Sequence, residues 1–252
     1  MAELVEAALV ISLTRATERR ERVGKEFAKA GLSLRFFDGV DGQKHFDTLL
    51  LRTDEARWRR NMGSPVNAGH LGCYASHVQL WETIGKEADK IYLVCEDDVT
   101  FGPDIKTAIA TALELQDQWD ICRFSALRAK GRIAQRSQNG FSLNAYWGPF
   151  TGNACYLIKS ETARRIAPRF WPITCAHDHE LNRFFDHDVR LFGLEPFAAK
   201  PKDLGQSFIT GQSKTNTEKF PKLKRLPYYS RKMISHGQRA LWLARNGFLF
   251  NR

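Results

Sequence analysis

Short, continuous apolar runs constrain the fold of this chain most, and the clearest are residues 7–13, 91–95 and 154–158. Each run has the length of a strand that is buried on both faces, as strands of parallel sheets are. A helical pattern over residues 17–30 and a second short strand over 34–37 follow the first run, so the chain opens as a β-α-β unit. We therefore predict an α/β fold.

The rest of the chain is less regular. Residues 43–68 are polar and mixed, which indicates an irregular insertion, and residues 128–142 have the composition of a mobile surface loop. A short helix is expected over 178–186. Because the composition changes after Pro201, we expect a main domain over 1–210 and a basic, aromatic C-terminal tail over 211–252.

The net charge and the cysteines of the sequence indicate which partners and which cellular compartment to expect. The formal net charge of +10 favours anionic partners but does not choose among nucleotides, phosphates and acidic lipids. The five cysteines are scattered and lack zinc-site spacing, so we expect reduced thiols in a reducing compartment. The N-terminal sequence does not have the pattern of a signal peptide, and no apolar run is long enough to span a bilayer. A cytoplasmic protein is expected, or one held at a membrane surface.

The strongest local signal is the acidic triplet Glu96-Asp97-Asp98, which comes directly after the apolar run 91–95. The carboxyl ends of parallel strands form the edge of a sheet where ligands bind. Three adjacent carboxylates repel one another, and the oxygen ligands that they offer suit Mg²⁺ or Mn²⁺. An acidic turn that caps the next helix explains the triplet equally well.

Two other segments are candidates for ligand contact. In residues 69–77, two glycines three apart permit close backbone approach, and His77 is either a ligand contact or a core histidine. After the first strand, Arg15 lies in the connection to a helix and could hold a nucleotide or diphosphate, whereas Arg22 is expected to be a solvated surface charge.

A later cluster, residues 175–180, contains two acids that could act as a general base. On a helix that starts near Asp178, the side chains of Asp178 and Glu180 point in different directions, so only one can face a given ligand. As structural alternatives, Asp178 could cap the helix and Glu180 could be an acid in its first turn.

Taken in order, these blocks resemble glycosyltransferase family 25, the bacterial lipooligosaccharide and lipopolysaccharide transferases related to the collagen galactosyltransferases. The match covers roughly residues 8–210, with Ser12 where the family usually has Asn and His70 where it usually has Glu. The segments that carry the resemblance are V-I-S-L-T-R at 10–15, F-D-G-V-D-G at 37–42, G-H-L-G-C-Y-A-S-H at 69–77, C-E-D-D at 95–98 and G-N-A-C-Y-L-I at 152–158.

The resemblance implies a GT-A type fold (a Rossmann-like mixed sheet flanked by helices), inversion at the anomeric carbon and a UDP-sugar donor, often UDP-galactose. The triplet would replace the GT-A metal motif, with Mn²⁺ or Mg²⁺ held by Asp98 and Glu96. Asp178 is the first choice for the base that deprotonates the acceptor hydroxyl, and Glu180 is the reserve. Contacts to the nucleotide sugar are expected from Leu13, Thr14, Arg15, Arg19, His77, Glu96, Asp97, Gly152 and Asn153.

The segment 219–252 suggests a further partner. It interleaves Lys and Arg with Leu, Tyr, Trp and Phe and contains no Asp or Glu, which suits the interface of an anionic membrane. Peripheral contact there would place the protein at the cytoplasmic face of the inner membrane, beside a lipid-linked or other saccharide acceptor. An ordinary helix packed on the domain, with a solvated basic side, is the alternative.

A different class of protein, a metal-dependent nucleic-acid-binding protein or nuclease, would also account for the net charge of +10 and the acids. Against it, the usual nuclease lysine near the acids is missing, since V-T-F-G follows at 99–102, and basic charge is concentrated in the tail. We therefore expect no nucleic-acid partner. A catalytically inactive carbohydrate-binding module is the third interpretation, which the intact triplet disfavours.

Overall fold

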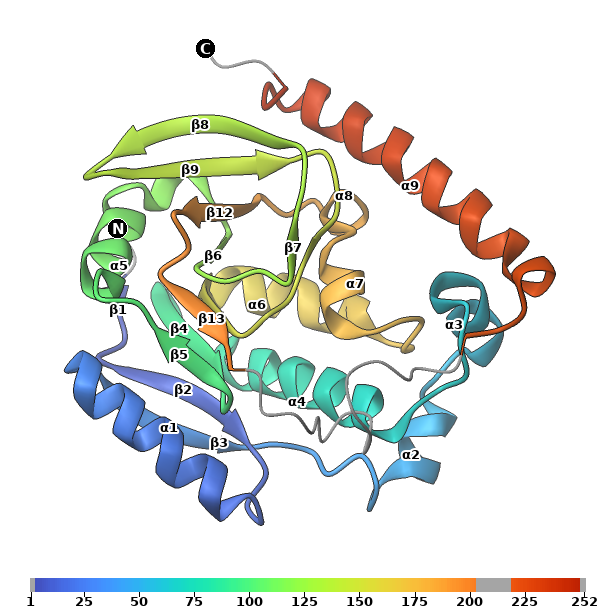
Figure 1. The fold of residues 1–252 in the computed structure, drawn as a ribbon, viewed down its shortest axis with the longest axis horizontal. Helices are drawn as coiled ribbons and strands as arrows, with labels where there is room; N and C mark the ends of the chain where they lie inside the picture. The colour runs from blue at the N-terminus through green and yellow to red at the C-terminus, as the bar shows by residue number, and fades with distance from the viewer. Residues whose placement is uncertain (1–2, 203–218, 250–252) are drawn as a thin grey trace.

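The computed structural model describes residues 3–202 and 219–249, which are built around one large mixed sheet (Figure 1). The strands of this sheet are β1 (Glu3–Leu4), β2 (Ala7–Ser12), β3 (Ser33–Asp38), β4 (Lys90–Glu96), β6 (Ile121–Arg123), β8 (Arg132–Gln138), β9 (Phe141–Tyr146), β11 (Cys155–Lys159) and β12 (Leu191–Glu195). Their order is β3-β2-β4-β11-β6-β12-β9-β8, with β1 paired to β4. Strands β2, β3 and β4 are parallel, whereas β11 runs antiparallel to its neighbours β4 and β6.

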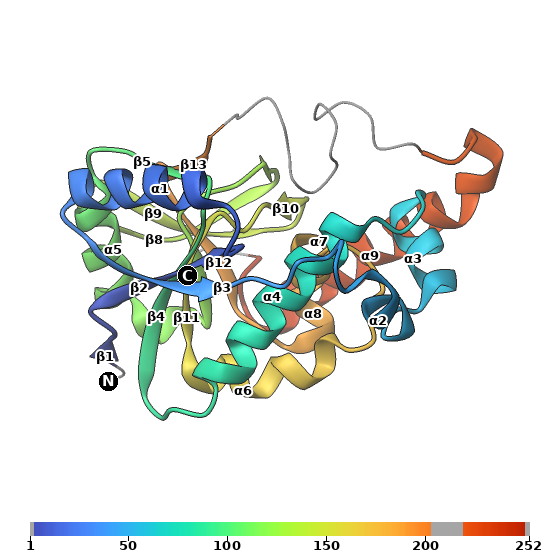
Figure 2. The same ribbon diagram turned by 90° about the horizontal axis from the view of Figure 1, so that it is seen from below.

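Helices cover both faces of the sheet (Figure 2). The chain leaves β2 toward β3 through α1 and returns across β2 to β4 through α4, so right-handed crossovers place these helices on opposite faces. The helices are α1 (Thr17–Ala30), α2 (Phe46–Leu51), α3 (Glu55–Met62), α4 (Ala68–Ile84), α5 (Ile105–Glu114), α6 (Ser160–Ile166), α7 (His177–Leu181), α8 (Phe184–His187) and α9 (Leu226–Arg245), with 3₁₀ turns η1 (Gln116–Gln118), η2 (Ala167–Phe170) and η3 (Lys222–Arg225).

The α/β fold predicted from the sequence is confirmed, and so are its opening elements. Strand β2 is parallel to both neighbours, and α1 has the predicted bounds and ends at Gly31, whose φ is 59°. That left-handed conformation favours glycine because a side chain would crowd the backbone. The predicted helix over 178–186 is instead two short helices, α7 and α8.

The prediction of an irregular insertion over 43–68 is wrong, because this segment contains α2 and α3. Asp54 caps α3 by accepting a hydrogen bond of 2.9 Å from the backbone N–H of Arg57. Trp58 is fully buried and fixes the helix to the domain. One buried side chain per short helix is too sparse a pattern for periodicity to reveal.

The prediction of a mobile loop over 128–142 is also wrong. This segment contains β7 (Arg128–Ala129) and β8, and its end begins β9. Strand β8 lies at the edge of the sheet, where a polar composition is usual, and it pairs with the largely buried β9. Two small sheets join β7 to β10 (Phe150–Thr151) and β5 (Val99–Phe101) to β13 (Ala199–Pro201).

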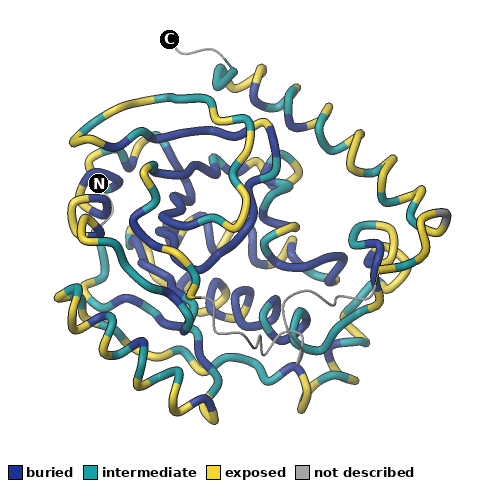
Figure 3. The backbone as a smooth tube through the Cα atoms, viewed as in Figure 1, coloured by how far each residue is buried: buried dark blue, intermediate teal, exposed yellow. Residues whose placement is uncertain are grey.

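Helix α9 lies along the rim of the molecule opposite α1, in contact with α3 and α8 (Figure 1). Arg239 and Leu243 on its inner side are buried, while much of the rest is exposed (Figure 3). None of the described helices combines the length and the apolar character needed to cross a bilayer. Residues 211–218 and 250–252 of the expected tail lie outside the described residues, and its division from residues 1–210 stays a prediction.

Candidate active site

Four of the segments singled out in the sequence, 10–15, 37–42, 69–77 and 95–98, meet in one pocket at the carboxyl ends of β2 and β4. This is the edge where doubly wound sheets bind ligands. The lining comes from the β2–α1 connection, the loop after β3, the start of α4 and the acidic triplet after β4. The residues are Ile11, Ser12, Leu13, Arg15, Ala16, Arg19, Gly39–Gln43, Gly69, Gly72, Cys73, Ser76, His77, Glu96, Asp97, Asp98 and Lys202.

Two glycines allow the loop after β3 to lie directly on α4. A Cβ on Gly72 would lie 2.7 Å from the backbone nitrogen of Gly42 and from the carbonyl oxygen of Val40. A Cβ on Gly42 would lie 1.8 Å from the carbonyl oxygen of Ala68. The Ser76 hydroxyl accepts a 2.8 Å hydrogen bond from the Val40 N–H and donates to the Gly72 carbonyl. Ser76 therefore fixes this wall of the pocket.

Asp97 is the structural member of the triplet. Its carboxylate accepts a 2.7 Å hydrogen bond from the Ser12 hydroxyl and forms an ion pair with Arg19. Its carbonyl accepts a 2.7 Å hydrogen bond from Arg22, so the expectation that Arg22 is a solvated surface charge is wrong. Arg22 lies one turn after Arg19 on α1 and reaches the same turn after β4, a contact that only the packing of α1 on the sheet creates.

Asp98 has an oxygen atom with no partner. Its Oδ1 is buried and accepts no hydrogen bond within the described structure, while its Oδ2 lies 3.6 Å from Arg19. Burial raises the pKa of Asp98 to about 7, and the charge of Glu96 adds to the shift. A buried carboxylate oxygen without a donor is costly unless a cation or donor meets it. The donor set of Asp98 and Glu96 therefore fits a hard divalent cation.

His77 connects the triplet to the core. Because Trp81 donates to the Tyr156 hydroxyl at 3.0 Å, that hydroxyl donates its own proton to His77 Nδ1 at 2.9 Å. In the neutral ring the remaining N–H is then on Nε2, which lies 3.4 Å from Glu96. His77 is fully buried, as a core histidine is, and it also lines the pocket, so its contact with a ligand stays a prediction. The side-chain atoms of Cys73, His77 and Glu96 that could bind a metal ion lie within 4.8 Å of one another.

Arginine side chains provide positive charge opposite the acids. Arg15 lines the pocket, is half-exposed and donates a 2.6 Å hydrogen bond to Asp41, whose pKa it lowers. Arg19 and Leu13 also line the pocket, whereas Thr14 does not and instead hydrogen-bonds to Asp38. The structure thus brings the predicted Arg15 and Arg19 to the same pocket as the triplet.

Asp178 does not line this pocket, and its position is held by its neighbours. The His177 ring stacks on the His77 ring, with centroids 4.2 Å apart, and packs against the Trp81 ring, with centroids 4.7 Å apart. These contacts fix the start of α7. The backbone N–H of Gly152 donates a 3.0 Å hydrogen bond to Asp178 Oδ2, and the Asn153 amide contacts His177 Nδ1 at 2.6 Å.

Cys73 shows how near Asp178 is to the acidic triplet. Burial raises the pKa of the Cys73 thiol, and the charges of Glu96 and Asp178 add to the shift. The thiol therefore lies within electrostatic reach of both acids. Asp178 lines a separate cavity of 370 Å³, while Gly152 and Asn153 support α7 and do not line the pocket at the triplet.

Glu180, the reserve candidate, lines neither the pocket at the triplet nor the cavity of Asp178. It is buried and accepts hydrogen bonds from Thr174 at 3.0 Å, and its other oxygen lies 3.0 Å from His187 Nε2. Arg183 forms an ion pair with it at 3.3 Å. These partners satisfy the carboxylate, so the structure gives Glu180 the geometry of a supporting residue on a different cavity.

The fold and the pocket define an α/β protein with an acidic pocket at the carboxyl edge of its parallel strands. The chain belongs to glycosyltransferase family 25, whose family model, described as glycosyltransferase family 25 (LPS biosynthesis protein), matches residues 5–181. The chain is 30% identical over 176 residues to lipooligosaccharide biosynthesis protein lic2B of Haemophilus influenzae, which covers 67% of this chain and 65% of that protein.

A glycosyltransferase 25 family member of Aedes aegypti is 31% identical over 127 residues, which cover 47% of this chain and 21% of that protein. The chain therefore spans less than two thirds of the length of either relative. Among solved structures, the inositol-1-phosphate CTP transferase from T. maritima is similar with a TM-score of 0.38 and 10% identity, over 79% of this chain and 71% of that one.

Proposed function

We propose that this chain is an inverting glycosyltransferase that moves a sugar from a UDP-sugar to a saccharide acceptor in the synthesis of lipopolysaccharide, lipooligosaccharide or another cell-surface glycan. By the family resemblance the sugar is galactose. The observation that carries the proposal is the pocket that Arg15 and Arg19 line together with Asp98, whose buried Oδ1 has no partner among the described residues. Such a site offers cations to a diphosphate and a ligand to a metal ion.

Asp98 and Glu96 would hold Mn²⁺ or Mg²⁺. The ion would supply Lewis-acid stabilisation of the charge that develops on the leaving nucleoside diphosphate. Arg15 and Arg19 bind and orient the diphosphate, and the loop after β3 closes the other side of the pocket. Asp97 keeps Arg19 and the turn after β4 in place through its own hydrogen bonds.

Asp178 is the base in this proposal. Its Oδ2 is held by the Gly152 N–H, and it lines a cavity separate from the pocket at the triplet. A base that faces the acceptor side can remove the proton from the attacking hydroxyl while the nucleotide leaves on the opposite side, which gives inversion. Glu180, enclosed by His187 and Arg183, is not needed for this step.

The test of the proposal compares Asp98→Ala with Asp104→Ala, an exposed acid a few residues further along. Turnover of UDP-galactose and other UDP-sugars is measured as released UDP, with and without Mn²⁺. Asp98→Ala is expected to lose turnover by about a thousandfold or more, as removal of one electrostatic catalytic group does, while Asp104→Ala remains active and both fold normally. Equal turnover by the two variants would remove the metal assignment.

For Asp178 we expect a different signature. Asp178→Asn keeps the hydrogen bond from Gly152, so the structure and the binding of UDP should be unchanged. Transfer to acceptor is expected to fall by about a hundredfold to ten-thousandfold, the usual contribution of a general base. Weakened UDP binding, or transfer at the normal rate, contradicts the assignment of the base.

Membrane contact through α9 also belongs to the proposal. The outer face of α9 is apolar, and Leu226, Tyr229, Met233 and Leu241, spaced to share one face, are between 44% and 72% exposed. An outward apolar face in a segment, 219–252, that contains no Asp or Glu and has lysines at 222, 224 and 232 suits an anionic bilayer surface. We infer peripheral association at the cytoplasmic face of the inner membrane.

Sedimentation with vesicles that contain phosphatidylglycerol tests this contact. Met233→Glu is expected to reduce binding, because it places a negative charge on the apolar face. Leu51→Glu is the matched control, since Leu51 is 90% exposed on α2, away from α9. Equal vesicle binding by the two variants would leave α9 as an ordinary packed helix.

A further inference from the structure

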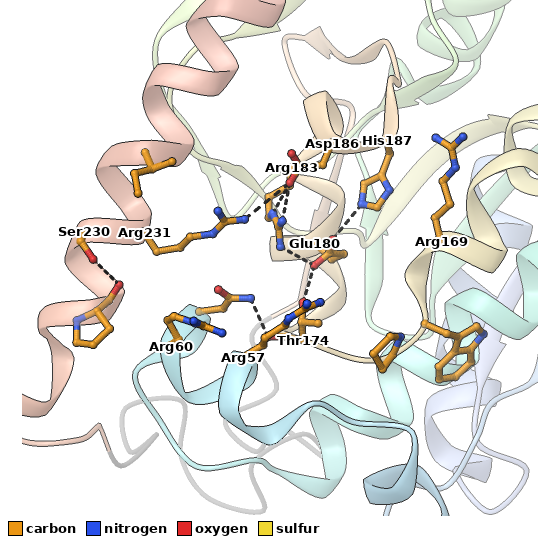
Figure 4. A pocket seen from close by; sticks show the side chains of 15 residues that line it. Arg57, Arg60, Arg169, Thr174, Glu180, Arg183, Asp186, His187, Ser230 and Arg231 are labelled. Carbon is orange, nitrogen blue, oxygen red and sulfur yellow. Dashed lines mark hydrogen bonds and ion pairs between the residues drawn. The ribbon is translucent and has the colours of Figure 1, made fainter.

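A cavity of 670 Å³ lies between α3, α7, α8 and α9, apart from the pocket at the acidic triplet. Figure 4 shows side chains of these elements pointing into it from opposite sides. Much of the wall is arginine: Arg57 and Arg60 come from α3, Arg169 from η2, Arg183 from the turn after α7 and Arg231 from α9. Five arginines from four parts of the chain meet only because the tertiary structure gathers them.

The acids in this cavity do not balance the arginines. Its lining contains two carboxylates, Glu180 and Asp186. Arg183 already pairs with both, at 3.3 Å and 2.5 Å, and Arg231 lies 3.9 Å from Asp186. The carboxylates are thus occupied, and the remaining arginines have no acid of the cavity left to pair with.

Arg60 and Arg169 are the arginines of the cavity that most clearly lack an acidic partner among the described residues. Both are exposed, and neither forms a hydrogen bond or an ion pair with any part of the chain that the structure describes. Burial lowers the pKa of Arg231, and the charge of Arg183 lowers it further, as expected where like charges crowd. An anion between these guanidinium groups would relieve the repulsion.

The chemistry of the wall selects the kind of anion. Guanidinium groups present parallel N–H donors that match the oxygens of phosphate, and several from different directions can surround a tetrahedral phosphoryl group. Trp171, Pro172 and Ile234 add apolar surface beside the arginines, which a sugar ring can cover. The volume of 670 Å³ exceeds that of a phosphate alone and leaves space for a phosphorylated sugar.

The cavity also adjoins the place where the acceptor would react. Glu180 lines it, and Asp178 is two residues earlier on the same short helix, in the cavity of 370 Å³. The two cavities share Asn61, Arg183 and Arg231 in their walls. A molecule whose hydroxyl reaches Asp178 can therefore extend into the arginine-lined cavity.

We propose that the arginine-lined cavity is a phosphate-binding subsite, which holds a phosphoryl group carried by the acceptor saccharide while its hydroxyl lies at Asp178. That the bound molecule is the acceptor rests on the proposed function. Binding of a sugar phosphate to the cavity can be measured without any transfer reaction. Binding energy from the phosphoryl group would orient the acceptor at a distance from the reacting atoms.

The test measures binding of glucose 6-phosphate to the full chain by isothermal titration calorimetry, with glucose as the uncharged comparison. The variant is Arg60→Gln/Arg169→Gln, which removes two exposed arginines of the cavity. The matched control is Arg59→Gln/Arg164→Gln, which removes the same charge from exposed positions on α3 and α6 that do not line the cavity.

We expect the cavity variant to weaken binding of glucose 6-phosphate by about tenfold or more, since two charged donors are lost, and the control by about twofold at most. Equal weakening by both variants, or none by the cavity variant, overturns the subsite. Asp98→Ala should bind glucose 6-phosphate normally. If the transferase assay fails while binding of glucose 6-phosphate still depends on the cavity arginines, the proposed function is rejected. The phosphate-binding subsite is then still supported.

A second arm distinguishes the source of the phosphoryl group. Vesicles that contain phosphatidic acid are sedimented with the same two double variants. We expect the cavity variant and the control to bind these vesicles equally, because the cavity is proposed to take a saccharide. If only vesicle binding depends on Arg60 and Arg169, the phosphate belongs to a lipid headgroup and the saccharide assignment is overturned.

Discussion

Alanine substitution at two helical glycines should change the free energy of unfolding in opposite directions: Gly72→Ala should lower it and Gly24→Ala should raise it. Gly72 on α4 touches the loop after β3, whereas a Cβ on Gly24 in α1 would meet no atom within 4 Å. Each change removes a glycine from a helix interior, which by itself stabilises by about 1 kcal/mol. The difference between the two variants therefore measures the close contact alone.

The cost at Gly72 follows from the contact distances. The added Cβ would lie 2.7 Å from two backbone atoms of the loop and 2.9 Å from a third, against 3.4 Å for an ordinary contact. The loop must therefore move by about 0.7 Å, and overpacking of this kind costs about 1–3 kcal/mol. The movement also stretches the 2.8 Å hydrogen bond between Val40 and Ser76, which is worth about 1 kcal/mol. After the helical gain, Gly72→Ala should be about 2 kcal/mol less stable than the natural chain.

Urea unfolding followed by circular dichroism gives the free energies of unfolding of the natural chain, Gly72→Ala and Gly24→Ala. Because the displaced loop forms a wall of the pocket, Gly72→Ala should also bind UDP more weakly, and Gly24→Ala should not. A Gly72→Ala chain as stable as Gly24→Ala would refute the close packing of the loop on α4 and the reasoning built on it.

Two further predictions concern buried charges. Arg239 donates to the carbonyls of Gly148 and Asn182 at 2.5 Å and 2.9 Å, so Arg239→Leu should loosen α9 and raise its amide hydrogen exchange, whereas Arg245→Leu, exposed on the same helix, should not. Burial alone would raise the pKa of Glu180, but the hydrogen bond from His187 and the charge of Arg183 lower it from 4.5 to about 2. Its stabilisation, about 3 kcal/mol, is fully present above pH 4.5 and lost as the pH falls toward 2. Urea unfolding of Glu180→Gln should show a lower stability at pH 7 and a weaker pH dependence below 4.5; an unchanged profile contradicts the ion-pair network.

The spacing of apolar residues along the sequence was sufficient to predict the main strands and the first long helix. The apolar runs correctly marked β2, β4 and β11, and the helical period gave α1 with its bounds, because a strand or a long amphipathic helix has a repeat that adjacent residues reveal. Short elements with a single buried anchor, such as α3 with Trp58, were missed because they carry less than one full repeat.

The family resemblance in the sequence also predicted that the acidic triplet, His77 and the arginines after β2 contact one nucleotide sugar, and these residues line one pocket at the carboxyl edge of the sheet. Only the tertiary structure decided what each of them does there. It turned Arg22 toward the carbonyl of Asp97, left one oxygen of Asp98 without a partner among the described residues, and separated Asp178 from Glu180 on one short helix. The same holds for the arginine-lined cavity and the outward apolar face of α9. Periodicity is a local property, whereas the charges that a cavity gathers come from distant elements and are set by packing.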